Sequence, residues 1–339
     1  MRDWLQRRWY QSDAAPPAGL KPLAALYGRI ADQRKNRLQP QAQRVGVPVI
    51  VVGNIAVGGT GKTPFVIWLV ELLRAQGWSP GVISRGYGAR APSYPFAVTR
   101  DSDPAHCGDE PLLIARRTGC PVMVDPNRVR AARALIAQAR VNIIVSDDGL
   151  QHYRLARDLE FCLVDGARGL GNGALIPAGP LRELASRLDT VDWVVINGEL
   201  TAPVAAPPHT LHMRLAVDRA RALDGSTARA LASFAGQKVH AVAGIGRPAR
   251  FFETLRAAGI EPIEHAFADH HGYHAQELQF GDDLPLLMTE KDAVKCERLG
   301  LQNAFFVPVT AQLLPDEVQR VQKSASDLRE GLGPSPTTT

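Results

Sequence analysis

The chain has 339 residues, of which 45% are hydrophobic and 22% charged, and its formal net charge is +5. This length allows two domains or one large domain, and the composition excludes a chain that is mostly disordered. The small positive balance favours anionic partners such as ATP, phospholipid surfaces or nucleic acid, without choosing among them.

Cysteine spacing and hydropathy exclude further classes of protein. The four cysteines lie far apart without a C-x-x-C pair, which argues against a disulfide framework or a zinc site and favours a reducing compartment. No run of residues reaches the roughly 20 uninterrupted apolar residues of a membrane-spanning helix. The charged N-terminus also lacks the apolar core of a secretory signal.

Residues 1–40 are predicted to form an N-terminal amphipathic helix. Arginines alternate there with aromatic and aliphatic residues at helical spacing, which include Trp4, Leu5, Trp9, Tyr10, Leu23, Leu26, Tyr27 and Ile30. Such a helix suits a membrane interface. It equally suits a helix that packs on the domain with its arginines in solvent, so these residues alone leave both interpretations open.

A glycine-rich stretch, AVGGTGKT at 56–63, separates the apolar run at 47–52 from a helical pattern. This order is the layout of a phosphate-binding loop, although Ala56 stands where the motif has glycine. The glycines let successive N–H groups turn towards an anion, and the helix N-terminus adds donors. Lys62 is expected to reach the β- and γ-phosphates and Thr63 to ligate Mg²⁺. The predicted nucleotide-binding residues are Ala56, Val57, Gly58, Gly59, Thr60, Gly61, Lys62 and Thr63.

Strands alternate with helices up to about residue 200. Short apolar runs without polar alternation predict strands at 80–86, 120–124, 142–146, 159–165 and 192–197. Strands of this kind indicate a parallel sheet that is covered on both faces. We therefore expect residues 41–200 to form a three-layer α/β domain of the P-loop NTPase type.

The remaining chain is expected to contain a second unit. Proline and alanine in TAPVAAPPH predict a linker and connecting segment at 201–235. Residues 236–325 are expected to form a smaller α/β domain that contributes to the active site. The end of the chain, 326–339, is predicted to be a disordered tail.

Carboxylates follow the predicted strand NIIVS. Asp147 and Asp148 come directly after it, which is typical of the Walker B strand that delivers carboxylates to Mg²⁺ beside a phosphate loop. A simple Asp-Gly turn is the alternative. Thr289-Glu290-Lys291-Asp292 matches the guanine-reading [NT]-K-x-D pattern poorly, so ATP is the expected nucleotide.

Transfer of phosphate to an alcohol requires a base near the acceptor hydroxyl. The sequence offers several candidates without choosing among them: Asp109, Asp147, Asp148 and Asp269, with His270 as an assisting group. Asp109 also fits a helix cap, because Asp109-Glu110-Pro111 is a good helix start.

A set of motifs resembles the tetraacyldisaccharide 4'-kinases, the lipid A 4'-kinases of Gram-negative bacteria. The resemblance covers about residues 15–325. The family carries Ser or Ala at the position of Ala56, which accounts for the departure from the loop motif. The motifs occur in the family's order and spacing: VGNIAVGGTGKTP, SRGYG, GDEPLLIA, SDDGLQH, LIPAGPLRE, GIGRPARFF, FADHH and TEKDAVK.

The resemblance implies an ATP- and Mg²⁺-dependent kinase. Its acceptor would be the 4'-hydroxyl of a tetraacylated glucosamine disaccharide 1-phosphate, at the cytoplasmic face of the bacterial inner membrane. Asp109 matches the catalytic base and His270 its partner from the second domain, with Lys62 on the transferred phosphoryl group. The implied metal residues are Thr63, Asp147, Asp148 and Glu183. The implied residues of the active-site periphery are Arg85, Tyr87 and Arg182.

The resemblance also bears on partners. A lipid substrate favours bilayer contact by the N-terminal helix, and neither nucleic acid nor an obligate protein partner is implied. Closure of the second lobe is expected to bring His270 to Asp109. Two alternatives remain: a P-loop ATPase switch, which would hydrolyse ATP without a lipid, and a soluble small-molecule kinase, in which residues 1–30 would be dispensable.

Overall fold

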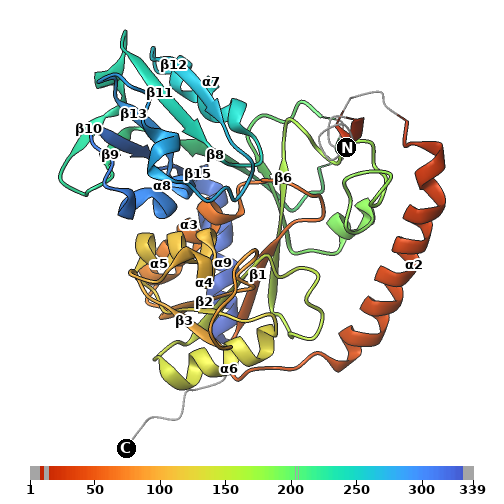
Figure 1. The fold of residues 1–339 in the computed structure, drawn as a ribbon. Helices are drawn as coiled ribbons and strands as arrows, with labels where there is room; N and C mark the ends of the chain where they lie inside the picture. Colours follow the sequence, from red (N-terminus) through yellow and green to blue (C-terminus); the bar gives the residue numbers. More distant parts are fainter. Residues whose placement is uncertain (1–7, 11–14, 203, 205, 331–339) are drawn as a thin grey trace, which may run out of the picture.

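Two β-sheets organise the chain. The computed structural model describes residues 8–10, 15–202, 204 and 206–330. The larger sheet has nine strands in the order β15-β8-β7-β6-β1-β5-β2-β4-β3, and the smaller has six in the order β10-β9-β14-β13-β11-β12. Figure 1 shows the smaller sheet above one side of the larger lobe, and α2 standing along the opposite side.

The centre of the large sheet is parallel and fully buried. β1 (Val49–Gly53) lies between β5 (Ile143–Asp147) and β6 (Leu159–Asp165) and pairs in parallel with both. Parallel strands continue the sheet on both sides: β2 (Pro80–Ser84), β4 (Val122–Val124), β7 (Trp193–Asn197) and β8 (Thr210–Ala216). Antiparallel strands form its edges: β3 (Phe96–Val98) and β15 (Thr310–Leu313). Apolar runs without alternation form these central strands because both faces are covered.

Helices cover both faces of this sheet. Two separate cores hold alternate residues of β1, with Ile50 in one and Val49 in the other, so they lie on opposite faces. One face carries α3 (Lys62–Ala75), α5 (Asp109–Thr118) and α9 (Pro315–Glu330). The other face carries α6 (Arg128–Gln138). The predicted three-layer α/β architecture is confirmed.

The smaller lobe is also an α/β unit. Its parallel strands are β11 (Lys238–Ala243), β12 (Glu261–Ala266), β13 (Leu286–Thr289) and β14 (Ala304–Val307). Its antiparallel strands are β9 (Arg219–Ala222) and β10 (Ala228–Ala230). Its helices are α7 (Pro248–Ala257) and α8 (Glu290–Cys296). The remaining short elements of the described chain are α4 (Pro104–Cys107), η1 (Ala18–Leu20), η2 (Gln39–Gln41), η3 (Ala185–Asp189), η4 (Leu231–Phe234), η5 (Ala275–Leu278) and η6 (Glu297–Leu299).

The boundaries between the two lobes differ from those expected. The segment 201–235, expected as a linker, contains β8 in the large sheet and β9 and β10 in the small one. β15 and α9 return to the larger lobe, although 236–325 was expected as one domain. These strands are short or partly exposed, so their apolar pattern is weak. The helix α9 includes residues 326–330 of the expected tail, and 331–339 lie outside the described residues.

The N-terminal segment divides into two parts. Residues 1–7 and 11–14 lie outside the described chain, and α2 spans Lys21–Leu38. Trp9 is buried and donates from Nε1 to the Pro177 carbonyl oxygen at 3.2 Å, and the Tyr10 hydroxyl donates to the Val57 carbonyl oxygen at 2.6 Å. These two aromatic residues therefore pack on the larger lobe. None of the described helices has the length and apolar character to cross a bilayer.

The four cysteines are free and buried. Burial raises the pKa of the Cys107, Cys162 and Cys296 thiols to about 12, and it also raises the pKa of Cys120. Since the thiolate is the reactive form, the native protein should react hardly at all with a thiol reagent at mildly alkaline pH. All four thiols should react after denaturation, and rapid labelling of the native protein would contradict this packing.

Candidate active site

The phosphate loop connects the buried end of β1 to α3. Two asparagines hold it: Asn54 Nδ2 donates to the Ala56 carbonyl oxygen at 2.7 Å, and Asn197 Nδ2 donates to the Thr60 carbonyl oxygen at 3.1 Å. Ala56 forms an antiparallel bridge with Leu181. An alanine is compatible with such a bridge because extended backbone does not require glycine.

A second part of the site is the carboxyl end of β5. Asp147 is the last residue of the strand and is buried, and the Ser84 hydroxyl donates to its Oδ2 at 3.2 Å. Asp148 lies 3.6 Å from Lys62 Nζ and 3.3 Å from an Arg182 guanidinium nitrogen. The loop lysine and the acidic strand end therefore meet, as expected for strands β1 and β5 that lie side by side.

The two aspartates have opposite electrostatic environments. Burial raises the pKa of Asp147, and the nearby Glu110 and Asp148 raise it further. Burial also raises the pKa of Asp148, but Lys62 and Arg182 outweigh this effect and lower its pKa overall. Lys62 and Arg128 also act on Asp147, but they do not outweigh its burial and its acidic neighbours.

These residues fit a magnesium ion that is held mainly by phosphates. Asp147 Oδ1 is buried without a hydrogen-bond partner, and Thr63 lies in the first turn of α3. Across the described part of the chain, no three His, Cys, Asp or Glu side chains gather closely enough to hold a metal alone. Mg²⁺ beside a nucleotide takes only one or two protein ligands and completes its shell with water and phosphate oxygens.

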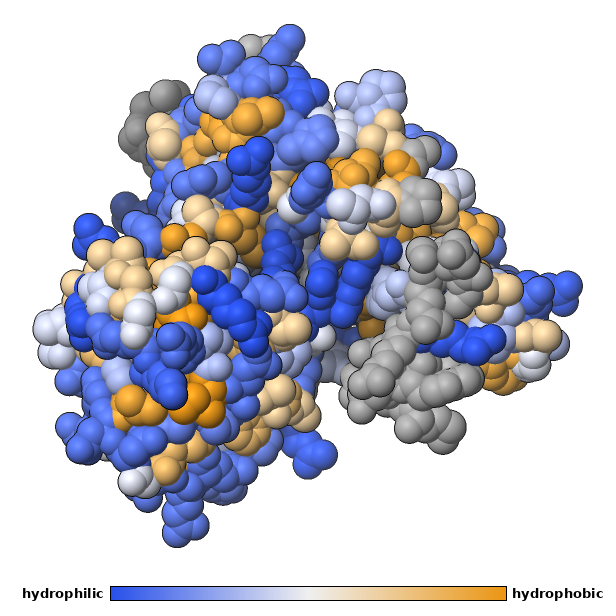
Figure 2. All heavy atoms as spheres, turned by 90° about the horizontal axis from the view of Figure 1, so that it is seen from above, coloured by the Kyte–Doolittle hydropathy of each residue, from blue (hydrophilic) through white to orange (hydrophobic). Residues whose placement is uncertain are grey.

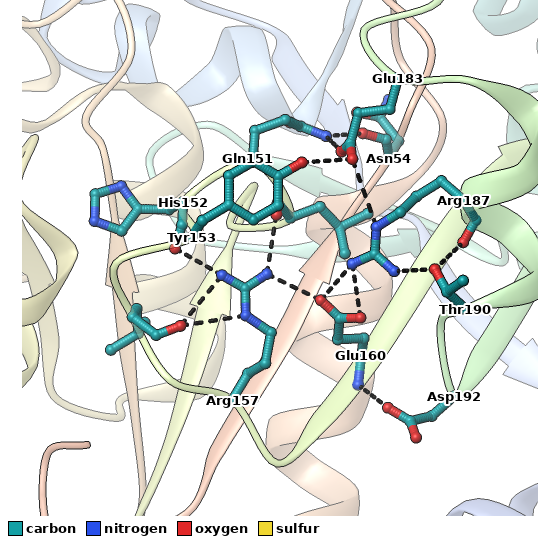
Figure 3. A network of polar contacts seen from close by, with 12 residues as sticks. Asn54, Gln151, His152, Tyr153, Arg157, Glu160, Glu183, Arg187, Thr190 and Asp192 are labelled. Atoms are coloured by element: carbon teal, nitrogen blue, oxygen red, sulfur yellow. Dashed lines mark hydrogen bonds and ion pairs between the residues drawn. The ribbon is translucent and has the colours of Figure 1, made fainter. Parts of the chain in front are cut away.

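The carboxylate of Glu183, predicted as a metal residue, is engaged elsewhere. It accepts hydrogen bonds from Gln151 Nε2 at 2.6 Å and from the Tyr153 hydroxyl, and Arg187 Nε lies 3.5 Å away. Figure 3 shows these groups in one polar network that continues from Arg187 to the buried Glu160. Metal binding by Glu183 would require it to leave these donors.

The third part of the site joins the two lobes. Asp109 is the first residue of α5, and Gly108 rather than Asp109 occupies the cap position. His270, which follows β12 on the smaller lobe, lies with Nδ1 3.1 Å from Asp109 Oδ2. His271 instead contacts Glu277 at 3.2 Å. The structure thus shows that His270, and not His271, contacts Asp109, which the sequence alone did not decide.

Cations lower the pKa of Asp109. Burial raises it, but the hydrogen bond from His270 and the charges of Lys295 and Lys291 act in the opposite direction and dominate. Asp109 is therefore ionised at neutral pH, and it is held in this form by groups of the other lobe.

Of the predicted peripheral residues, Tyr87 lies beside this pair and Arg182 lies beside Asp148. Tyr87 is 65% exposed, and its ring centroid lies 5.6 Å from that of His270. Arg85 directly follows β2 and is exposed, and Arg182 contacts Asp148. Seen from above, the molecule has a hollow near the middle of this face, and the visible side chains around it are mostly hydrophilic (Figure 2).

Several charged residues of the interface between the lobes were not assigned from sequence. Arg247 and Arg250, at the start of α7, lie 3.0 and 3.8 Å from Asp165 at the end of β6. Lys291 and Lys295 of α8 approach the start of α5. All four belong to GIGRPARFF or TEKDAVK, but their partners lie far away in the sequence and only the fold brings them together.

A parallel sheet with a glycine loop after β1 and an aspartate pair after β5 defines a P-loop nucleotide-binding protein, here with a second lobe over the site. A family model described as Tetraacyldisaccharide-1-P 4'-kinase matches residues 17–326. The chain belongs to this family, which confirms the resemblance seen in its motifs.

Individual relatives agree with this assignment. A Tetraacyldisaccharide 4'-kinase of Alkalilimnicola ehrlichii is 52% identical over 312 residues, which cover 91% of this chain and 92% of the relative. One of Pseudomonas aeruginosa is 51% identical over 307 residues, 89% of this chain and 91% of the relative. The crystal structure of LpxK from Aquifex aeolicus in complex with ATP matches with a TM-score of 0.76 and 26% identity, over 92% of this chain and 98% of that one.

Gly61 offers a test of the loop. Its φ is +90°, and an added Cβ would lie 2.5 Å from Asn197 Nδ2. We expect Gly61→Ala to weaken ATP binding by about tenfold or more, because a side chain there is strained by roughly 1–2 kcal/mol even before the clash. Isothermal titration with ATP and Mg²⁺ measures this.

Gly59→Ala is the matched control in the same loop, since an added Cβ meets no atom within 4 Å and the backbone is not left-handed. It should lose less affinity than Gly61→Ala. Equal losses would mean that close approach of the phosphates, rather than loop conformation, sets the requirement for glycine.

Proposed function

We propose that the chain is an ATP-dependent kinase that transfers the γ-phosphate of ATP to the 4'-hydroxyl of a tetraacyl glucosamine disaccharide 1-phosphate, a step of lipid A biosynthesis. Family membership and the likeness to an ATP-bound relative support this proposal. The observation that carries it is the contact of Asp109 with His270 across the lobes, at 3.1 Å.

This contact lies close to the phosphate loop. A Cβ added to Gly246 of the smaller lobe would lie 3.7 Å from the Gly59 nitrogen and 3.6 Å from Asp269 Oδ2. Asp269, the residue before His270, and Gly59 of the phosphate loop thus both lie next to Gly246. A pair that takes up a proton from an acceptor alcohol needs this proximity to the γ-phosphate.

The nucleotide site uses the loop and the acidic strand end. ATP would supply the phosphoryl group. Thr63, Asp147 and Asp148 would hold Mg²⁺, which would neutralise charge on the phosphates. The loop N–H groups and Lys62 bind the β- and γ-phosphates, and the ammonium group offsets charge on the transferred phosphoryl. Glu183 remains a prediction, since its carboxylate is bound by Gln151 and Tyr153.

Asp109 acts as the base in this scheme. Its lowered pKa leaves the carboxylate free of a proton at neutral pH, so it can accept the proton of the 4'-hydroxyl as the oxygen attacks. His270 orients the carboxylate through Oδ2. Tyr87, Arg85 and Arg182 line the periphery, where Arg182 also steadies Asp148.

We further propose that α2 binds the cytoplasmic surface of the inner membrane, as a peripheral or monotopic contact. Its side chains Leu23, Leu26 and Ile30 are 53, 54 and 57% exposed, at intervals of three and four residues. Such a stripe on one face of a helix, with basic residues beside it, suits an anionic lipid surface. Trp9 and Tyr10 do not belong to this surface, because both pack on the larger lobe.

The proposed activity predicts transfer of label from ATP to lipid. Purified protein in detergent micelles, with γ-labelled ATP, Mg²⁺ and the tetraacyldisaccharide 1-phosphate, should label the lipid. Asp109→Asn should lower this rate by about 10²–10⁴-fold, because the amide cannot accept the proton. Its ATP affinity, measured by titration, should stay close to that of wild type.

Release of free phosphate at the same rate with and without lipid would instead identify an ATPase switch. Near-normal lipid labelling by Asp109→Asn would leave the kinase intact and contradict the assignment of the base.

The proposed membrane surface predicts that the triple variant Leu23→Ser, Leu26→Ser, Ile30→Ser binds anionic vesicles at least about tenfold more weakly, because exposed apolar area drives insertion. Vesicle sedimentation measures this, and the melting temperature should not change since these side chains are more than half exposed.

Leu314→Ser is the control, since Leu314 is 54% exposed but lies between β15 and α9. Unchanged vesicle binding by the triple variant would exclude the α2 surface as the membrane contact.

A further inference from the structure

The larger and smaller lobes meet along a charged seam between α5 and α8. The pairs that cross it are Arg117 with Glu290 at 2.8 Å, Lys291 with Glu110 at 3.2 Å, Lys295 with Asp109 at 3.8 Å and, beyond the end of α8, Arg116 with Glu297 at 2.7 Å. The pair at Asp109 involves a residue with a proposed chemical function. Its cation, Lys295, is the subject of this inference.

Lys295 is a buried cation with two acidic neighbours. Its side chain is 7% exposed, and its Nζ lies 2.9 Å from Asp292 Oδ1 and 5.0 Å from the Tyr273 ring centroid. Asp292 is fully buried and also accepts hydrogen bonds from the Gly244 nitrogen and the Thr289 hydroxyl. Asp292 is thus fixed from three sides, and it fixes the ammonium group in turn. Burial of such a cation is costly unless carboxylates compensate it.

We propose that Lys295 is a positioning residue for phosphoryl transfer, which holds the Asp109 carboxylate ionised and oriented towards His270. This inference rests on the proposed function of Asp109 as the base. Lys295 Nζ and His270 Nδ1 both approach Oδ2 of Asp109. Oδ1 is therefore the oxygen that would accept the proton of the sugar hydroxyl.

Other charges around Asp109 do not replace Lys295. Lys291 Nζ lies 3.2 Å from both Glu110 and Asp269, so it compensates these two carboxylates. Lys295 lowers the pKa of Asp109 more than Lys291 does. The titratable groups that act on Asp109 are Cys107 on its own lobe and His270, Tyr273, Lys291 and Lys295 on the other. The neighbouring carboxylates contact the two lysines: Glu110 and Asp269 contact Lys291, and Asp292 contacts Lys295.

The proposal predicts a change in the pH profile. Because the folded protein lowers the pKa of Asp109, its active, ionised form persists to lower pH than it would without the cation. Lys295→Met removes the charge and keeps the length of the side chain. The acid limb of kcat/KM for lipid phosphorylation should then move upward by about one pH unit or more.

Two further variants separate charge from packing. Lys295→Arg keeps the charge and should keep the acid limb near its wild-type position. Lys295→Met leaves Asp292 buried without its cation, which should lower the melting temperature. The double variant Lys295→Met, Asp292→Asn should restore the melting temperature, while the acid limb of its pH profile should remain shifted. Lys291→Met, on the same helix, is the matched control and should shift the limb less.

The outcomes distinguish this inference from the proposed function. If wild type gives no labelled lipid, the proposed function fails. If wild type labels the lipid but the folded double variant keeps the wild-type acid limb, Lys295 has no effect on Asp109 and the inference is overturned. An equal loss of rate at every pH, with no shift, would also overturn it and assign Lys295 a purely structural function.

Discussion

The arrangement of the active site depends on the pairing of charges across the seam between α5 and α8. Asp109 and His270 are 161 residues apart in the chain and meet only because the lobes meet. Charges that leave water are costly unless each finds a partner. In this seam Arg117, Glu110 and Asp109 find their partners on the opposite lobe, whereas Lys291 and Lys295 also contact Asp269 and Asp292 on their own lobe. The contact of Asp109 with His270 thus lies among charge pairs that join the same two lobes.

A second seam ties the smaller lobe to the nucleotide loop. Arg247 and Arg250 reach Asp165 at the end of β6, and Arg250 also approaches Asn197, whose amide holds the Thr60 carbonyl. The loop and the smaller lobe therefore share Asn197. In this arrangement of the lobes His270 reaches Asp109. Because both seams are polar, such an interface is compatible with opening and closing of the lobes.

Local patterns were sufficient for the central parallel strands of the larger lobe and for the position of the glycine loop between β1 and α3. Glycines between an apolar strand and a helix, and aspartates at the end of a neighbouring strand, identify chemistry within a few residues of sequence. The return of β15 and α9 to the large sheet, and the partners of Glu183 and Lys295, depend on contacts between distant segments. An amphipathic sequence also does not show whether its apolar side chains contact lipid or pack against protein. Trp9 packs on protein, whereas Leu26 is exposed.

The electrostatics of the aspartates follow from where the chain places its cations. Lys62 and Arg182 face Asp148, and His270 and Lys295 face Asp109, so both carboxylates have lowered pKa values. Asp147 is buried among carboxylates, its pKa is raised, and one of its oxygens has no partner. Cations of the protein thus outweigh burial at Asp109 and Asp148, whereas at Asp147 the charges of Lys62 and Arg128 do not outweigh it. A divalent cation bound there with its nucleotide would add positive charge beside Asp147, and metal binding would then be coupled to completion of the site.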